Sequence, residues 1–82
     1  MRNILVVYDL DPVYWEVKGR GFQCGDDIWT FARWDLQDLM SKTHSKTFDK
    51  VLFMFKPPLN QADERWLYIT PNVKTFDDIV II

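Results

Sequence analysis

Residues 3–12 read NILVVYDLDP, and this stretch decides what kind of fold the 82-residue chain can form. From Ile4 to Tyr8 every side chain is apolar or aromatic, so both alternating faces of a strand here would be apolar. Such a pattern is typical of a strand that is covered on both sides. Asp11 and Pro12 then end the strand, because Pro fixes φ and Asp accepts hydrogen bonds from nearby backbone N–H groups.

The length and composition predict one domain over residues 1–82. A chain of this size buries only about 60–65% of its unfolded surface, which leaves no material for a second core. Apolar residues make up 48% of the chain, and 13 residues are aromatic (four Trp, three Tyr and six Phe). Because aromatic side chains bury large areas, we expect an ordered core rather than a disordered chain.

Ten Lys and Arg residues stand against twelve Asp and Glu residues, which gives a net charge of −2 and a pI near 5.1. A protein held to DNA or RNA by phosphate contacts needs a clear excess of basic residues. The charge balance therefore argues against nucleic acid as the main partner, although it is compatible with a local basic patch.

Cys24 is the only cysteine, so no disulfide can form within the chain, and this absence fits a reducing compartment. Asp9 interrupts the first apolar run far short of the length of a membrane span or a signal peptide. The sequence predicts a cytoplasmic protein without membrane association.

One main helix is predicted over residues 28–40, after Asp26 and Asp27. These carboxylates supply an N-cap acceptor and a negative charge at the positive end of the helix dipole. Apolar side chains share one face of this helix: Ile28, Trp29, Ala32, Leu36, Leu39 and Met40. Residues 59–64 are compatible with a short helix or with a loop. Strands are predicted, besides the first, over residues 13–17, 48–56, 65–70 and 76–82.

Together these elements predict an α+β fold: a single small domain with a four- to five-stranded, mostly antiparallel sheet and one main helix packed on one face. A hairpin joins the first two strands. Three strands are apolar on both faces, yet only one helix is available as a cover, so one face of the sheet lacks a cover within the chain. We expect another protein, or a second copy of the chain in a homodimer, to cover that face.

The segment ending in Asp9 and Asp11 resembles the first motif of the haloacid-dehalogenase-like phosphotransferases, in which a strand is followed by DxD. The resemblance implies a nucleophilic Asp9, a general acid at Asp11 and a bound metal. Asp26 and Asp27 resemble the acidic motif of that family, but they follow after only about fifteen residues, where the family has several βα units. Pro12 also replaces a small residue. A turn is therefore the preferred interpretation of the first two aspartates.

Tyr8 and Asp9 at the end of the first strand also resemble the start of the small CRISPR-associated nucleases, which have about this length. The Arg and the Ser-x-Phe segment that the family has after its first helix are not visible here. The resemblance implies a metal-dependent nuclease that uses Asp9. A small metal-dependent nuclease or phosphotransferase using Asp9 is thus kept as an alternative function.

No constellation in the sequence predicts a catalytic site or a metal site. The doublets at Asp63, Glu64 and at Asp77, Asp78 lack the spacing of metal ligands. His44 and the single cysteine lie twenty residues apart and form neither a zinc site nor a nucleophile–base pair. We therefore predict no catalytic residue, no metal and no cofactor.

A partner-binding surface is predicted on one flank of the 28–40 helix. Trp34 lies away from the apolar face of the helical wheel, and exposed Trp residues are enriched at the centres of protein interfaces. Carboxylates on the same flank would select a basic partner surface. The alternative is that another segment covers Trp34 and makes it part of the core. The predicted partner-binding residues are Phe31, Trp34, Asp35, Asp38 and Asp27.

A basic cluster follows the predicted helix. It consists of Lys42, His44, Lys46 and Lys50, with Phe48 beside it. The cluster is interpreted as a solvated connection, and contact with an anionic partner such as RNA is the other interpretation. A nucleic-acid-associated protein using Lys42 to Lys50 is therefore a further alternative function.

The sequence as a whole favours a non-catalytic protein-binding module. Small aromatic-rich chains without a catalytic constellation often act by occupying a functional surface of another protein. An inhibitor or modulator encoded by a phage or mobile element is a concrete form of this hypothesis, which rests on size and composition rather than on a motif.

Overall fold

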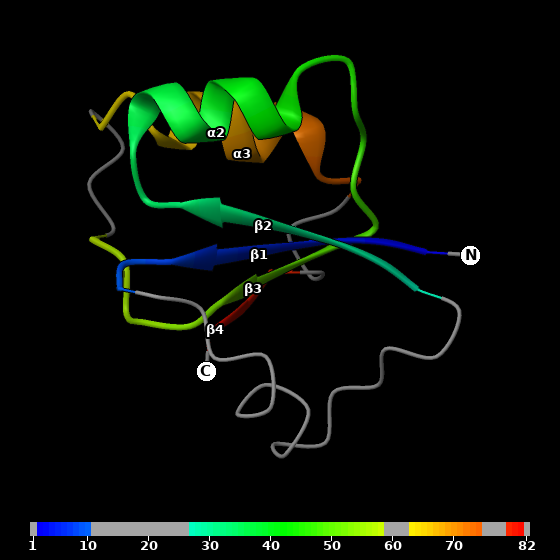
Figure 1. Cartoon of the computed structure of the whole chain (residues 1–82), viewed down its shortest axis with the longest axis horizontal. Helices are drawn as coiled ribbons and strands as arrows, with labels where there is room; N and C mark the ends of the chain where they lie inside the picture. Colours follow the sequence, from blue (N-terminus) through cyan, green and yellow to red (C-terminus); the bar gives the residue numbers. More distant parts are fainter. Residues whose placement is uncertain (1, 11–26, 59–62, 75–78, 82) are drawn as a thin grey trace.

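The protein is an α/β domain with a four-stranded parallel sheet (Figure 1). The computed structural model describes residues 2–10, 27–58, 63–74 and 79–81. The sheet order is β2-β1-β3-β4, and both helices of the described chain lie on the same face of the sheet. The elements are β1 (Asn3–Tyr8), β2 (Ile28–Arg33), α2 (Leu36–Thr43), β3 (Lys50–Phe53), α3 (Trp66–Ile69), a short 3-10 helix (Thr70–Asn72) and β4 (Ile79–Ile81).

Strand β1 occupies the centre of the sheet, as its sequence requires. It pairs with β2 on one side, from Asn3 opposite Ile28 onward, and with β3 on the other side. Its four central residues, from Ile4 to Val7, are buried, because strands cover both edges of β1 and side chains pack on both of its faces. The prediction of a strand covered on both sides is confirmed.

Each face of the sheet carries its own apolar cluster. The cluster beneath the helices is formed by Leu5, Val7, Ala32, Trp34, Leu39, Phe48, Val51, Phe53, Ile69 and Val73. The opposite face buries Ile4, Val6 and Leu52, against which Trp29, Phe31, Met54 and Val80 pack. The central residues of this second face are thus buried within one chain. A homodimer through that face stays a prediction.

The prediction of a helix over residues 28–40 is wrong for the first half of that range, which forms β2. Trp29 and Phe31 face one side of the sheet, while Ala32 faces the helices, so the side chains follow the period of a strand. The helix begins only after Asp35, whose extended backbone (φ −148°, ψ 137°) is that of an N-cap residue. The carboxylate of Asp35 accepts a hydrogen bond from the backbone N–H of Asp38 at 3.2 Å.

A second carboxylate ties the start of α2 to the end of β2. Asp38 Oδ2 accepts a hydrogen bond from the backbone N–H of Arg33 at 2.6 Å. The backbone N–H of Asp35 in turn donates to the Arg33 carbonyl at 2.7 Å. Both backbone groups of the last residue in β2 are therefore used by the strand-to-helix turn. At the other end of α2, Ser45 has a positive φ of 57°.

The segment over residues 65–70 is helical, so the predicted strand there is wrong. Trp66 and Ile69 both pack toward the cluster beneath the helices, which is the i, i+3 spacing of one helix face. The predicted strand at 48–56 is confirmed in its central part, since β3 spans Lys50–Phe53. The strand at 76–82 is likewise represented by β4, Ile79–Ile81.

The mostly antiparallel sheet with one main helix is corrected to an all-parallel sheet with two helices, within the described residues. The predicted strand at 13–17 and its hairpin lie outside the described residues, as do Asp11, Cys24, Asp26 and the Asp77, Asp78 doublet. None of the helices in the described part of the chain is long and apolar enough to cross a bilayer.

Candidate binding site at the carboxyl edge of the sheet

The parallel strands bring several polar side chains to one edge of the sheet. Asp9 follows β1, and Trp34 and Asp35 follow β2, while the backbone N–H of Trp34 donates to the Tyr8 carbonyl at 2.8 Å. In open parallel sheets, ligands bind in the crevice outside the carboxyl ends of the strands. An open cavity of about 500 Å³ lies at this edge and is lined by Tyr8, Asp9, Arg33, Trp34, Asp35 and Asp38.

A second cavity adjoins the first and shares Trp34 and Asp35 with it. This cavity of about 380 Å³ lies between the start of α2 and the start of α3. Its lining consists of Trp34, Asp35, Leu36, Asp63, Glu64 and Arg65. We refer to the two cavities as the edge cavity and the interhelix cavity. Together they form one continuous candidate surface.

Trp34 forms the wall between this surface and the core. Only 7% of Trp34 is exposed, and its ring makes edge contacts with Phe53, Phe55 and Trp66 at centroid distances of 5.9, 5.7 and 5.4 Å. Such edge-to-face geometry is favourable for aromatic pairs. Among the described residues no group accepts a hydrogen bond from the buried Nε1 of Trp34. Trp34 is therefore a closely packed residue between the cavities and the core, and its indole N–H has no acceptor among the described residues.

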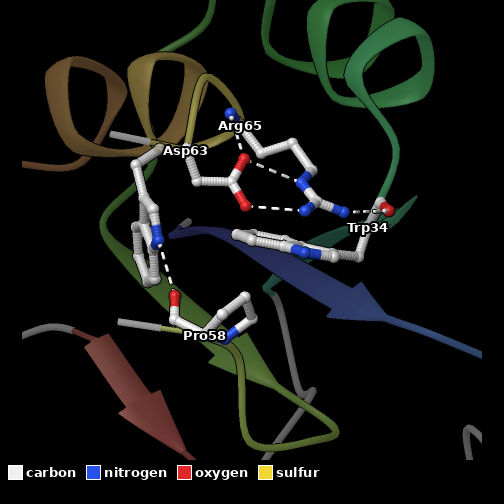
Figure 2. A network of polar contacts seen from close by, with 5 residues as sticks. Trp34, Pro58, Asp63 and Arg65 are labelled. Carbon is white, nitrogen blue, oxygen red and sulfur yellow. Dashed lines mark hydrogen bonds and ion pairs between the residues drawn. The ribbon is translucent and has the colours of Figure 1, made fainter. Parts of the chain in front are cut away.

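The Arg65 guanidinium lies over the Trp34 ring and forms an ion pair with Asp63 (Figure 2). The guanidinium donates to the two Asp63 carboxylate oxygens at 2.9 and 2.6 Å, and its carbon lies 4.8 Å from the Trp34 ring centroid. This combines a bidentate charge-assisted pair with a cation–π contact. The hydrogen bonds from Arg65 hold the pKa of Asp63 below its usual value, and the same pairing raises the pKa of Arg65.

Trp66, which contacts the Trp34 ring, is also tied to the segment that follows β3. Trp66 Nε1 donates to the Pro58 carbonyl at 2.9 Å, and this bond is drawn in Figure 2. Arg65 Nη1 lies 3.5 Å from the Trp34 carbonyl oxygen, at the outer limit of a hydrogen bond. The start of α3 is thereby bonded both to Trp34, directly after β2, and to Pro58, in the segment after β3.

Negative charge exceeds positive charge around the two cavities. Among the residues that the structure describes, five carboxylates and two guanidinium groups line them. Asp63 is neutralised by Arg65, and Asp38 is engaged by the backbone N–H of Arg33. Asp9, Asp35 and Glu64 are exposed to solvent. The surface is thus suited to attract a cationic group.

The five predicted binding residues do not form one surface. Trp34, Asp35 and Asp38 come together at the edge cavity, but Trp34 is buried, so the alternative interpretation, in which Trp34 is part of the core, is the correct one. Phe31 packs on the opposite face of the sheet. Asp27 lies at the other end of β2, where its carboxylate pairs with Arg2 at 3.0 Å. Whether these residues bind a partner stays a prediction.

Sequence reasoning missed the contributions of Arg33, Leu36, Glu64 and Arg65 to this surface. A parallel sheet would have indicated them in part, because the residues that follow each strand then gather at one edge. The doubly apolar first strand is the signal for such a sheet. Nothing in the sequence pattern placed the start of α3 beside the start of α2.

The described structure shows no group of metal ligands, and the basic cluster lies away from the two cavities. Among the residues that the structure describes, no group of three or more His, Cys, Asp or Glu side chains could hold a metal ion. In the basic cluster, Lys42, His44 and Lys46 stand at the end of α2, and Lys50 begins β3. This cluster lies at the amino edge of the sheet, opposite the two cavities, because α2 runs antiparallel to the strands (Figure 1).

Comparison of the chain with protein-family models, with curated proteins and with solved structures finds no significant match.

Proposed function

We propose that this protein is a non-catalytic protein-binding module whose contact surface is the carboxyl edge of the sheet. The observation that carries the proposal is the continuous surface of two open cavities in which carboxylates outnumber guanidinium groups. The partner is another protein that presents a basic surface. An inhibitor or modulator of that partner, encoded by a phage or mobile element, is the form of this function that we favour.

The surface combines the two properties that a protein interface needs. Exposed carboxylates steer a basic partner and suppress wrong partners. Exposed apolar side chains next to them supply contact area, since Leu10, directly after Asp9, is 80% exposed and Leu36 is 40% exposed. The rigid wall of Trp34 and Arg65 keeps the surface in a fixed shape, which lowers the entropic cost of association.

The proposal is tested by affinity capture from the lysate of the native host with tagged protein and two variants. The first variant carries Asp9→Asn and Glu64→Gln, which remove exposed charges without touching the helix caps. The control carries Lys42→Gln and Lys46→Gln at the opposite edge. We expect a stoichiometric protein partner that is lost from the first variant, kept by the control, and released as salt concentration rises.

Retention of the partner by the Asp9 and Glu64 variant would refute the proposed surface. Loss of the partner from the Lys42 and Lys46 control would instead assign binding to the basic cluster, and nuclease treatment of the lysate would show whether nucleic acid is involved. Size-exclusion chromatography of the pure protein over a range of concentrations tests the homodimer.

A metal-dependent phosphotransferase or nuclease is the second candidate, and one observation favours it. Asp9 stands at the carboxyl end of an inner strand of a parallel sheet and lines the edge cavity. This candidate predicts hydrolysis of a phosphate mono- or diester with Mg²⁺ or Mn²⁺, abolished by Asp9→Asn. Activity that survives Asp9→Asn would exclude Asp9 as its origin, and activity absent from the wild type would count against this candidate.

A further inference from the structure

We propose that the outer surface of α2 and α3 is the interface of a two-fold symmetric homodimer, in which α2 packs antiparallel to the α2 helix of a second copy. The inference goes beyond the proposed function, because it concerns association of the chain with itself rather than with another protein. It also differs from a dimer through the opposite face of the sheet, since the helices form the contact.

The two helices lie side by side on one face of the sheet, and their outer surface carries apolar side chains that are open to solvent (Figure 1). Among the described residues, six large apolar side chains are exposed, and three of them lie on α2 or α3: Leu36 (40%), Met40 (49%) and Leu67 (66%). Leu36 and Met40 are four residues apart and share one side of α2. The Tyr68 hydroxyl lies 3.9 Å from Met40 Sδ, so that side faces α3. Grouped apolar side chains of this kind mark interaction sites, whereas single ones do not.

The charge of α2 changes sign along the helix. Asp35 and Asp38 lie at its start, Lys42 lies in its last turn, and Lys46 follows it. Asp38 and Lys42 are four residues apart and share the side of α2 that faces away from Met40. Among the described residues Lys42 forms no ion pair, so its ammonium group is available to a carboxylate of another molecule.

This charge pattern is complementary to itself when two α2 helices pack antiparallel. With the two-fold axis at the level of Met40, Asp38 of each copy lies opposite Lys42 of the other, so the symmetry forms the same pair twice. Gln37 and Ser41, both exposed, lie along the line of contact between the two helices. The Met40 side of each α2 then faces α3 and the second copy at once, which removes its apolar surface from water.

The charges also favour a second copy over other occupants of this surface. A purely basic partner would match only the first half of α2, and a purely acidic partner would match only the second half. A parallel pair of α2 helices would place like charges opposite each other, which is unfavourable. Only an antiparallel copy satisfies both halves of the helix.

The first test is the oligomeric state of the pure full-length protein, measured by sedimentation equilibrium. We expect a dissociation constant between about 1 μM and 1 mM, because two short helices per copy form an interface at the small end of the size range. Met40→Asp should raise this constant at least about tenfold by placing a charge in the apolar surface. Lys42→Gln should raise it about two- to thirtyfold, since each dimer loses two exposed ion pairs. Lys56→Gln, the same loss of charge at an exposed position after β3, should leave it unchanged.

Disulfide cross-linking tests the antiparallel packing of α2 directly. In a Cys24→Ser background, Ser41→Cys should form a covalent dimer under mild oxidation, because Ser41 lies close to the two-fold axis. Lys56→Cys in the same background is the matched control and should stay largely monomeric. Circular dichroism spectra of each variant and the wild type show whether the fold is intact.

Three results would overturn the interface. These are a monomer throughout the concentration range, a dimer that neither Met40→Asp nor Lys42→Gln weakens, and cross-linking of Lys56→Cys as complete as that of Ser41→Cys. The second result would assign association to another surface, such as the opposite face of the sheet. Because these measurements use the pure protein, their failure is distinct from failure of the affinity capture, which tests the proposed function.

Discussion

Replacement of Trp34 by alanine should strongly destabilise the domain. Trp34 is 93% buried, as its exposed fraction of 7% shows, and it makes edge contacts with three aromatic rings. Truncation of a buried Trp to Ala costs about 3–5 kcal/mol through lost transfer free energy and an unfilled cavity. A domain of 82 residues has a total unfolding free energy of about 4–12 kcal/mol. The substitution therefore removes about a quarter of the stability or more.

The assay is urea unfolding followed by far-UV circular dichroism, with thermal unfolding as a second measurement. A loss of about 4 kcal/mol corresponds to a fall in Tm of about 15–30 °C for a domain of this size. Trp34→Phe should lose less, because a phenyl ring keeps part of the edge contacts and the unsatisfied indole N–H is removed. Trp29→Ala, on the other face of the sheet and outside this ring cluster, is the matched control and should also cost less.

Two results would refute this reasoning. One is a Trp34→Ala variant that unfolds within about 1 kcal/mol of the wild type, because such a small loss is typical of a surface position. The other is a Trp34→Phe variant that is as unstable as Trp34→Ala, which would mean that the edge contacts of the ring are not the source of stability.

Three further predictions concern the caps and the ion pairs. Asp35→Ala should lower the unfolding free energy by about 1 kcal/mol through loss of the N-cap. Asp35→Ser should lose much less, because serine also accepts the capping hydrogen bond. If urea unfolding shows the same loss for both variants, the cap does not contribute to stability. Ser45→Gly should raise stability by about 0.5–1 kcal/mol, because Ser45 has φ 57° and glycine adopts that region without strain; a lower Tm would contradict this. The hydrogen bond from Lys74, together with one from the Asn3 backbone, holds the pKa of Asp49 below its usual value of 3.8, and Arg65 acts likewise on Asp63. Since both folded-state pKa values are lowered, these carboxylates contribute stability above pH 3.8 that is lost as pH falls through the folded-state values, and Asp49→Asn should flatten the urea midpoint between about pH 5 and pH 2.

The sequence predicted strands best where their composition allowed one interpretation. The run from Ile4 to Tyr8 is too short and too apolar for anything but a covered strand, and β3 has the same character. Strands that are apolar on both faces are typical of a parallel sheet, so the predicted antiparallel pairing did not fit the composition of these strands. The nearby Asp11 and Pro12 suggested a hairpin, and the hairpin suggested antiparallel pairing.

The helix was misplaced because two periodicities compete after Asp27. Residues 28–33 alternate as a strand, yet three of their apolar residues also fit a helical wheel when combined with Leu36 and Leu39. Asp35 followed by Asp38 was the local signal for the true start, since these carboxylates hold the helix N-terminus. Residues 66–69 carry Trp, Tyr and Ile, which favour strands, and only tertiary packing makes them helical.

The residues of the candidate site could be predicted only in part, because their arrangement follows from the parallel sheet and the second helix. Asp35 and Asp38 were predicted as surface carboxylates, and the structure keeps them at an accessible edge. Asp35 and Glu64 come to line one cavity only because α3 packs beside α2, about thirty positions later in the chain. Such a long-range contact has no local sequence signal, which is why Glu64 and Arg65 were not predicted.

The hydrogen bond from Arg33 to Asp38 also bears on how the chain avoids aggregation. In the order β2-β1-β3-β4, β2 is an outer strand, and free backbone groups on outer strands are templates for pairing with other chains. The N–H of Arg33 donates to the Asp38 carboxylate, and the C=O of Arg33 accepts from the backbone N–H of Asp35. The start of α2 therefore keeps these two groups at the end of β2 from pairing with another chain. Fraying of that turn would expose these two groups. Conditions that loosen the helix should therefore promote strand-to-strand association before the whole domain unfolds.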